Sequence, residues 1–255
     1  MRTHLRATLA TRLWFVWCVF WAVLTTAVLS PCVVLHSMVR PGANTFKLWA
    51  GLWSRATLAL CGIRVRVEGA TDVPEPVVLA VNHQNGFDIL VTGAGIPIPF
   101  VYGAKVELRR WPFIGWVLDR TACLFVDRSG PKQALRSMME AADRIRDGAS
   151  VLLFPEGGRS WTHGLLAFMR GPFLIAIQAG VPVVPVAIVG NTGVLDEKRR
   201  VAWPGVVRLV IGEPIATDGL ARRDSEALGE RVRTWMGERL AEAGPLEEPT
   251  PLDLS

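Results

Sequence analysis

Two polar stretches, each directly after an apolar run, carry the side chains best suited to chemistry. The apolar run from 78 to 81 is followed by His83 and, five residues later, by Asp88. This spacing places the two side chains on different faces of an ideal helix, so a turn must bring them together. Gly86 supplies the conformational freedom for such a turn. Asp88 then lies near the start of a helix-like run from 87 to 91, where the helix dipole favours a carboxylate.

In that geometry Asp88 accepts a hydrogen bond from one imidazole nitrogen of His83, and the other nitrogen faces outward. This is the arrangement of an oriented general base. A second interpretation stays open on these two residues alone: His83 satisfies a loop carbonyl, and Asp88 caps a helix.

The second polar stretch runs from 154 to 160 and follows the apolar run from 151 to 153. Glu156, Gly157 and Arg159 lie here in a glycine-containing turn, where backbone N–H groups and a guanidinium can bind phosphate. Arg128 follows another apolar run and would be a second phosphate clamp. Ordinary surface ion pairs are the alternative for both arginines, but positions at strand ends favour ligand binding.

Nothing in the sequence indicates a covalent enzyme intermediate. The chain has no G-x-S-x-G nucleophile motif, and none of its cysteines, Cys18, Cys32, Cys61 and Cys123, lies near His83 in sequence. Ser160 is a poor nucleophile candidate. The cysteines also form no C-x-x-C pair, so we expect neither a metal site nor a disulfide framework, and a reducing compartment.

Short strands alternating with helices must position these residues. The strand candidates are 63–69, 77–81, 99–102, 121–126, 150–154, 183–189 and 206–211. Helices are predicted at 132–147, from an apolar stripe with helical spacing, and at 224–243. This alternation predicts an α/β fold with a largely parallel sheet flanked by helices.

The N-terminal part has a different character. Leu13 to Leu35 is nearly unbroken apolar sequence after three arginines, long enough to cross about 30 Å of hydrocarbon as a helix. A cleaved signal peptide is disfavoured, because Pro31 precedes the only cysteine in a cleavage-like context and tryptophans interrupt the apolar centre. Basic residues on both flanks leave the orientation open. We expect Pro31 to break the helix, so that the segment dips into one leaflet and residues 46–53 form a second, interfacial helix; a single span is the alternative.

Three tryptophans, Trp14, Trp17 and Trp21, recur on one face of this segment. Such an aromatic face suits the interfacial depth of a bilayer, with core packing as the alternative.

Composition points to a lipid surface. Half of the 255 residues are hydrophobic and the net charge is +5, which favours an anionic membrane surface as partner. No nucleic-acid-binding motif is present. We therefore expect a segment 1–62 associated with the membrane, a catalytic domain at 63–243 and a tail at 244–255.

Four motifs resemble one family. His83 with Asp88 is similar to the H-x4-D motif of the glycerolipid acyltransferases, and residues 154–160 are similar to their F-P-E-G-T-R-S motif. Residues 125–128 and 181–186 resemble the family's second and fourth motifs. The resemblance implies the α/β acyltransferase fold. It also implies transfer of a fatty acyl group from acyl-CoA or acyl carrier protein to the 2-hydroxyl of lysophosphatidic acid, at the cytoplasmic face of the inner membrane, with no metal and no cofactor beyond the acyl donor.

The resemblance assigns roles to single residues. His83 takes the hydroxyl proton and Asp88 fixes its tautomer, while Arg128, Glu156, Gly157 and Arg159 bind the acceptor's glycerol phosphate. Lys105 matches another family stretch and is a weaker candidate for holding the oxyanion or the phosphate; a solvated lysine at a helix start is the alternative.

Departures from the family pattern leave the acceptor open. Gly158 stands where threonine is usual, Ala122 where glycine is usual, and Arg170 is one of two basic residues often found there. The chain thus has rivals to the main interpretation: an acyltransferase for another lysolipid such as lyso-ornithine lipid, a thioesterase, or a non-catalytic lipid-binding membrane protein.

Overall fold

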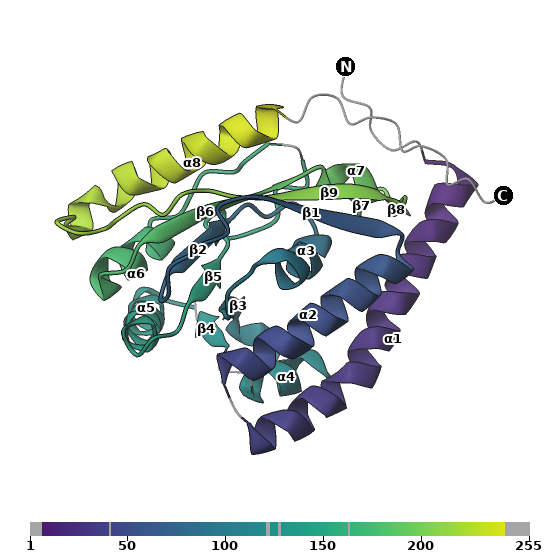
Figure 1. Cartoon of the computed structure of the whole chain (residues 1–255), viewed down its shortest axis with the longest axis horizontal. Helices are drawn as coiled ribbons and strands as arrows, with labels where there is room; N and C mark the ends of the chain where they lie inside the picture. Colours follow the sequence, from purple (N-terminus) through teal and green to yellow (C-terminus); the bar gives the residue numbers. More distant parts are fainter. Residues whose placement is uncertain (1–6, 41, 121–122, 127–128, 163, 243–255) are drawn as a thin grey trace.

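The computed structural model describes residues 7–40, 42–120, 123–126, 129–162 and 164–242. Two long helices, α1 (Leu9–Val39) and α2 (Ala43–Leu60), precede an α/β layer structure. Figure 1 shows α1 and α2 side by side along one edge of the molecule, with α2 between α1 and the sheet. The predicted tail at 244–255 lies outside the described residues.

Within the described residues, one sheet has seven strands in the order β1-β9-β6-β2-β5-β3-β4. The strands are β1 (Ile63–Gly69), β2 (Val78–Val81), β3 (Val101–Lys105), β4 (Leu124–Val126), β5 (Val151–Leu153), β6 (Val183–Val189) and β9 (Gly205–Ile211). All neighbours pair in parallel except β6 with β9, which run antiparallel. The prediction of a largely parallel sheet is confirmed.

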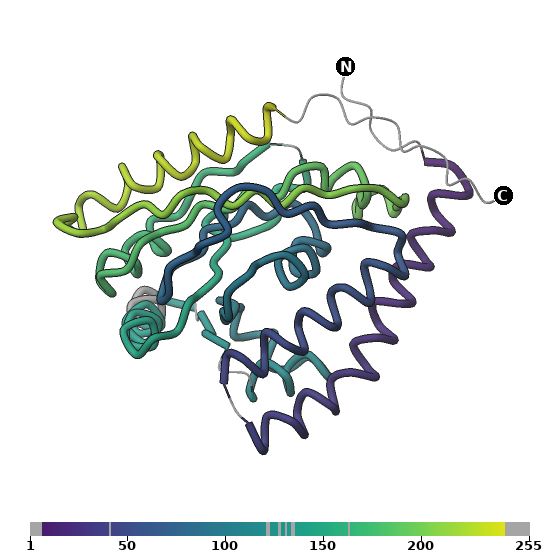
Figure 2. The backbone as a smooth tube through the Cα atoms, in the orientation of Figure 1, coloured from purple at the N-terminus to yellow at the C-terminus, as the bar shows by residue number. Residues whose placement is uncertain are grey.

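Period-two patterning places helices on both faces of this sheet. In β2, Leu79 and Val81 belong to the core under α2 and α3 (Phe87–Gly95), whereas Val78 and Ala80 face the other core. Because both faces are covered, the central strands β2, β5 and β6 are buried along their whole length and have continuous apolar sequences, whereas β1 alternates apolar and polar residues. The second core lies under α5 (Pro131–Arg146), α6 (Gly171–Ala179) and α8 (Ser225–Glu242), and Figure 2 shows the tubes of these helices on that side of the sheet.

Short elements complete the chain. They are η1 (Val106–Arg110), α4 (Ile114–Arg120), α7 (Asn191–Val194), the two-stranded sheet of β7 (Leu195–Asp196) and β8 (Val201–Ala202), and η2 (Arg222–Asp224). α4 packs against α1, and β8 also contacts α1. The N-terminal helices are therefore joined to the α/β part by several contacts.

The predicted break at Pro31 is wrong. α1 continues through Pro31 to Val39, and α2 begins at Ala43. The expected helix at 46–53 exists as the middle of α2. A proline removes one backbone hydrogen bond, a cost that the remaining ladder and packing on α2 offset in a helix of 31 residues.

The tryptophans of α1 also serve packing inside the protein. Trp14 Nε1 donates to the Cys61 carbonyl at 3.1 Å, and Trp17 Nε1 donates to the Leu60 carbonyl at 2.8 Å. These bonds attach α1 to the C-terminal end of α2, where α-helical carbonyls lack intrahelical partners. Core packing, the alternative interpretation of the aromatic face, therefore describes Trp14, while Trp17 is still 44% exposed.

Gly69 is required where β1 ends. Its φ is +91°, and a Cβ there would lie 2.0 Å from the Ile211 carbonyl oxygen, which already accepts from Ala70 N–H. Gly148 has a similar φ of +98° but open space around it.

Replacing Gly69 with alanine should therefore lower Tm more than Gly148→Ala does. Both variants share backbone strain, but only Gly69→Ala adds a clash, worth about 1–3 kcal/mol. At roughly 2–4 °C per kcal/mol, the two Tm values should differ by several degrees in thermal unfolding in detergent. Equal Tm values would contradict the close approach of β1 and β9.

Candidate functional site

The site lies where neighbouring strands of the sheet end. β2, β5, β3 and β6 are parallel, so their carboxyl ends meet at one edge, the usual place for ligands in open α/β sheets. His83 follows β2, Phe154 follows β5, Lys105 ends β3 and Asn191 follows β6. Residues far apart in the sequence are thereby brought together.

His83 and Asp88 form the pair expected from their spacing. The His83 Nδ1 and Asp88 Oδ2 atoms are 2.7 Å apart. The same oxygen accepts from the backbone N–H groups of Gln84 at 2.5 Å and Asn85 at 2.9 Å. Asp88 is fully buried in the first turn of α3, where the helix dipole favours its negative charge. The turn and the imidazole are thus fixed by one carboxylate.

Asn191 supports this carboxylate from the segment that follows the neighbouring strand β6. Its Nδ2 donates to Asp88 Oδ1 and, at 2.9 Å, to Asn85 Oδ1, and the residue is fully buried. Sequence reasoning missed Asn191, because more than 100 residues separate it from Asp88. Its one signal is a polar side chain shortly after the apolar strand β6.

Gly86 has a role other than the expected one. Its φ and ψ of −68° and −23° are open to any residue. A Cβ there would instead lie 2.5 Å from Glu197 Oε1, which accepts from Gly86 N–H at 2.7 Å. Glycine is therefore needed for this close approach, and the prediction that the turn needs its backbone freedom is wrong.

Glu156 holds the backbone around the histidine. Oε1 accepts from His83 N–H and Oε2 accepts from Leu166 N–H, each at 2.7 Å. Burial raises the pKa of Glu156 above its ordinary value, and the two backbone donors oppose that shift. The carboxylate is absent from the cavity lining described below. Its contacts position His83, and binding of substrate by Glu156 itself has no support in them.

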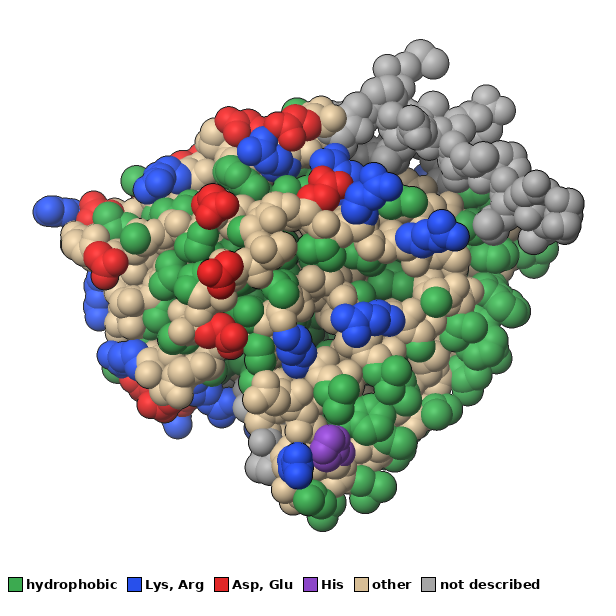
Figure 3. All heavy atoms as spheres, viewed as in Figure 1, with side chains coloured by type: hydrophobic (Ala, Val, Ile, Leu, Met, Phe, Trp, Pro, Cys, Tyr) green, Lys and Arg blue, Asp and Glu red, His purple; other side chains and the backbone are tan. Residues whose placement is uncertain are grey.

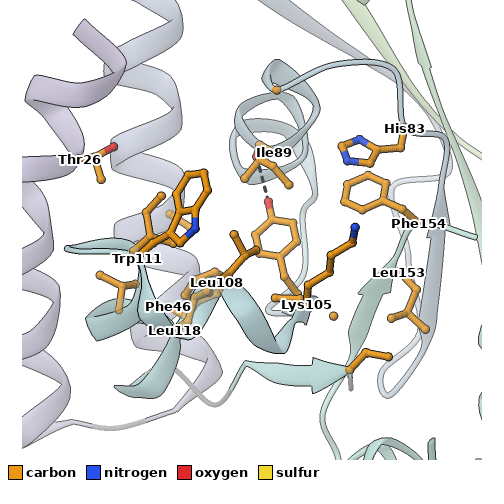
Figure 4. A pocket seen from close by; sticks show the side chains of 18 of the residues that line it. Thr26, Phe46, His83, Ile89, Lys105, Leu108, Trp111, Leu118, Leu153 and Phe154 are labelled. Atoms are coloured by element: carbon orange, nitrogen blue, oxygen red, sulfur yellow. Dashed lines mark hydrogen bonds between the residues drawn. The ribbon is translucent and has the colours of Figure 1, made fainter. Parts of the chain in front are cut away.

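The ring of His83 stacks on Phe154, with centroids 4.1 Å apart and planes 19° apart. Figure 4 shows the two rings facing each other, with the Lys105 amine pointing toward them from the end of β3. Because Nδ1 is hydrogen-bonded to the buried Asp88, Nε2 is the ring nitrogen available to a ligand in the cavity. His83 is thus held by a hydrogen bond and a stacked ring.

A cavity of about 720 Å³ opens at this histidine. His83, Lys105, Gly157 and Arg159 line one end, and the rest is mainly apolar. The far part is lined by residues of α1, α2, η1 and α4, among them Thr26, Phe46, Leu108, Trp111 and Leu118 (Figure 4). The shape and lining suit a ligand with a polar head at His83 and an apolar chain extending to the N-terminal helices.

Arg159 lies at the polar end of the cavity in an ion pair. Its Nη1 is 2.8 Å from Glu197 Oε2, and its guanidinium lies 5.1 Å from the ring centre of Trp161. The arginine is thus in an ion pair and also lines the cavity, and its binding of phosphate stays a prediction. Arg128 lies outside the described residues. Gly157, with a φ of +69°, forms the turn at the cavity wall.

Ser160 is placed as a structural residue. Its backbone N–H donates to the His83 carbonyl at 2.8 Å, and its Oγ lies 3.2 Å from the Thr162 carbonyl oxygen. Among the described residues, no group of three or more His, Cys, Asp or Glu side chains is arranged to hold a metal ion.

Comparison with known proteins agrees with this geometry. Residues 64–189 match the family model described as Acyltransferase. The 1-acyl-sn-glycerol-3-phosphate acyltransferase of Pseudomonas aeruginosa is 34% identical over 195 residues, which cover 75% of each chain. The enzyme of the same name from Saccharomyces cerevisiae is 31% identical, over 72% of this chain and 62% of its own length.

Two further relatives extend the match. The lyso-ornithine lipid O-acyltransferase of Rhizobium meliloti is 30% identical over 82% of this chain and 84% of its own. The crystal structure of the 1-acyl-sn-glycerophosphate acyltransferase from Thermotoga maritima has the same fold, with a TM-score of 0.78, 24% identity, and 94% and 98% of the two chains covered. The fold, the motif residues and these relatives together show that the chain belongs to the acyltransferase family.

Proposed function

We propose that this protein is a membrane-associated O-acyltransferase that acylates the 2-hydroxyl of lysophosphatidic acid to give phosphatidic acid. The His83–Asp88 pair at the polar end of an apolar cavity carries the proposal. The Pseudomonas and yeast relatives, both named as acyltransferases of 1-acyl-sn-glycerol-3-phosphate, support the choice of acceptor.

In the proposed reaction His83 Nε2 accepts the proton of the acceptor hydroxyl as its oxygen attacks the thioester carbonyl. Asp88 stabilises the imidazolium that forms, because its carboxylate is already bonded to Nδ1. The proton then passes to the leaving thiolate, and no acyl-enzyme is formed. The donor is acyl-CoA or acyl carrier protein.

Two cations flank the place where charge develops. Arg159 and Lys105 both line the polar end of the cavity. Arg159, with its planar guanidinium, suits the acceptor's phosphate, while the Lys105 amine points toward the stacked His83 and Phe154 rings and suits the oxyanion (Figure 4). Gly157 borders the same end, where its turn is proposed to contact the phosphate.

Membrane association is supported by α1. Of the described helices, α1 is the one long and apolar enough to cross a bilayer, and only 17% of its most apolar window is buried. A core helix of a soluble protein would be mostly buried. Figure 3 shows hydrophobic side chains gathered along the edge of the molecule that α1 forms. The proposed location is the cytoplasmic face of the inner membrane.

α4 and the turn before it add aromatic side chains to the apolar surface. Trp111, Phe113 and Trp116 are 57%, 36% and 54% exposed, and α4 packs against α1. Aromatic rings of this kind are typical of the membrane interface. A bilayer around α1 would cover these side chains too.

A second candidate function is acylation of lyso-ornithine lipid. The Rhizobium relative with that printed name aligns over a larger share of both chains than the Pseudomonas enzyme does. Lysophosphatidic acid carries a phosphate and lyso-ornithine lipid does not. Arg159 at the polar end of the cavity therefore favours lysophosphatidic acid as the acceptor.

Replacing His83 with alanine should abolish acyl transfer. Loss of a general base costs about 10²–10⁴-fold in rate, and Asp88→Asn should cost a similar factor because it removes the charge that stabilises the imidazolium. The measurement is thiol release from long-chain acyl-CoA or acyl carrier protein, with phosphatidic acid as product. His36→Ala, which removes an imidazole that accepts from Trp49 Nε1 and lies outside the cavity lining, is the control and should keep most of the wild-type activity, because it leaves the His83–Asp88 pair intact.

Thiol release by the wild type without any lysolipid would instead indicate a thioesterase. Full activity of His83→Ala would rule out its role as the base.

Among acceptors, the wild type should prefer lysophosphatidic acid to lyso-ornithine lipid and to monoacylglycerol. The phosphate gains charge-assisted hydrogen bonds from Arg159, worth about 1.5–3 kcal/mol, so kcat/KM should differ by on the order of tenfold or more. The three acceptors are compared in the same detergent with the same donor. A preference for lyso-ornithine lipid would establish the second candidate instead.

A charge placed on α1 should weaken membrane binding. Val23 is 63% exposed on α1, and an aspartate near the centre of a membrane helix costs about 2.5–3.5 kcal/mol. Val206→Asp is the control, because Val206 is 49% exposed on β9. Flotation with anionic vesicles should show less bound protein for Val23→Asp only. An equal loss for both variants, or release of the wild type by high salt alone, would contradict insertion of α1.

A further inference from the structure

Glu197 is an acidic residue that contacts both Arg159 and the turn after His83. It follows β7 at the start of the turn that leads to β8. Oε2 lies 2.8 Å from Arg159 Nη1, and Oε1 accepts from Gly86 N–H at 2.7 Å. Gly86 belongs to the turn between His83 and Asp88. A single carboxylate therefore joins the arginine at the cavity mouth to the turn that carries the histidine.

The carboxylate is held in place for this contact. Its side chain is 24% exposed, and a Cβ on Gly86 would lie 2.5 Å from Oε1, so the carboxylate lies this close to the backbone of residue 86 because that residue is glycine. A carboxylate with one oxygen on a backbone N–H and the other on a guanidinium has little freedom to rotate. The arginine is thus directed by a fixed partner.

A second cation, Lys198, lies near Arg159, so a negatively charged partner stabilises the arginine in this position. Lys198, the next residue along the chain, lies 5.8 Å from the ring centre of Trp161, and Arg159 lies 5.1 Å from the same centre. Two cations on one indole repel each other. Glu197 offsets this repulsion and keeps the guanidinium beside the cavity.

We propose that Glu197 is a positioning residue that holds Arg159 ready for the anionic head group of the acceptor. The inference rests on the proposed function, because it assumes that Arg159 binds the acceptor phosphate. It adds the residue that directs Arg159 and so sets how strongly the phosphate is preferred.

The contacts also indicate which kinetic parameter depends on Glu197. The turn around His83 is fixed independently, because Asp88 accepts from Gln84 N–H and Asn85 N–H and from Asn191. Loss of Glu197 should therefore leave the base in place and release the arginine. The effect is expected in KM for the lysolipid, with kcat little changed.

The test compares wild type, Glu197→Ala, Glu197→Gln and Asp196→Asn with lysophosphatidic acid and monoacylglycerol as acceptors. Glu197→Ala should raise KM for lysophosphatidic acid about tenfold, the equivalent of one charge-assisted hydrogen bond, and leave KM for monoacylglycerol unchanged. Glu197→Gln should be intermediate. Asp196→Asn is the control and should match wild type. In the wild type the Asp196 carboxylate accepts from Arg199 N–H in the same turn, and it is not bonded to Arg159.

The same comparison can be made without turnover by measuring the dissociation constants of both lipids for variants that also carry His83→Ala. Combining Glu197→Ala with Arg159→Ala in this background completes a double-mutant cycle. Glu197→Ala should weaken lysophosphatidic acid binding in that background and have no further effect when Arg159 is already alanine.

Each other outcome has a distinct meaning. Equal binding of the two lipids by the protein with Glu197 and Arg159 intact would refute the phosphate acceptor, and with it the proposed function. A normal preference that survives Glu197→Ala would refute the role of Glu197 alone. A lower KM in Glu197→Ala would show that the carboxylate competes with the phosphate, and a fall in kcat alone would show that it acts through the His83 turn; both overturn the proposal.

Discussion

A fully buried carboxylate fixes the geometry on which the site depends. Asp88 is removed from water, which would be costly for a charge without partners. It has backbone donors from its own turn, the imidazole of His83 and the side-chain amide of Asn191, which follows the neighbouring strand β6. These bonds form only when β2, α3 and β6 are assembled. The orientation of the histidine is therefore a consequence of folding, and no rearrangement is needed to create the base.

The same logic applies to the wider site. Parallel strands end at one edge, so loops from distant parts of the chain meet there. Glu156 connects the loop after β5 to the His83 backbone, and Asn82 connects the end of β2 to Ile188 in β6 through both its amide atoms. Each hydrogen bond lost from a buried polar network is costly, which ties catalytic geometry to overall stability. A substitution that disturbs one loop is thus expected to change the conformation of the loops that are hydrogen-bonded to it.

Sequence patterns predicted the elements whose signals are local. Buried strands in a parallel sheet are continuous apolar runs, and the ends of such runs mark the site, so His83 and Glu156 could be found without coordinates. The pairing of His83 with Asp88 was also predictable, because five residues and one turn separate them. The break at Pro31 was predicted wrongly, since local backbone preference does not report the packing of α1 on α2 that stabilises the helix.

Asn191 and Glu197 could not be predicted, because their contacts depend on how distant loops approach each other. Glu197 in particular lies in a charged run, Glu197 to Arg200, which resembles an ordinary solvated turn. Gly86 shows the same limit. Its glycine is explained by a carboxylate 111 residues away in the chain, and nothing in its own backbone conformation indicates it.

The cavity combines two kinds of wall. Near His83 it is built on strand ends, which the sheet holds rigidly, while farther away it is built on α1 and α2. Among the described residues, few pack against the outer face of α1, since only 17% of its most apolar window is buried, so detergent or lipid supplies the surroundings of the exposed part. The end of the cavity at His83 does not depend on the surrounding detergent or lipid. The depth available to a long apolar ligand depends on both the protein and its detergent or lipid. The selectivity for acyl-chain length measured in a detergent micelle therefore depends on the detergent. In bilayers of different thickness, the same protein is expected to show different selectivity.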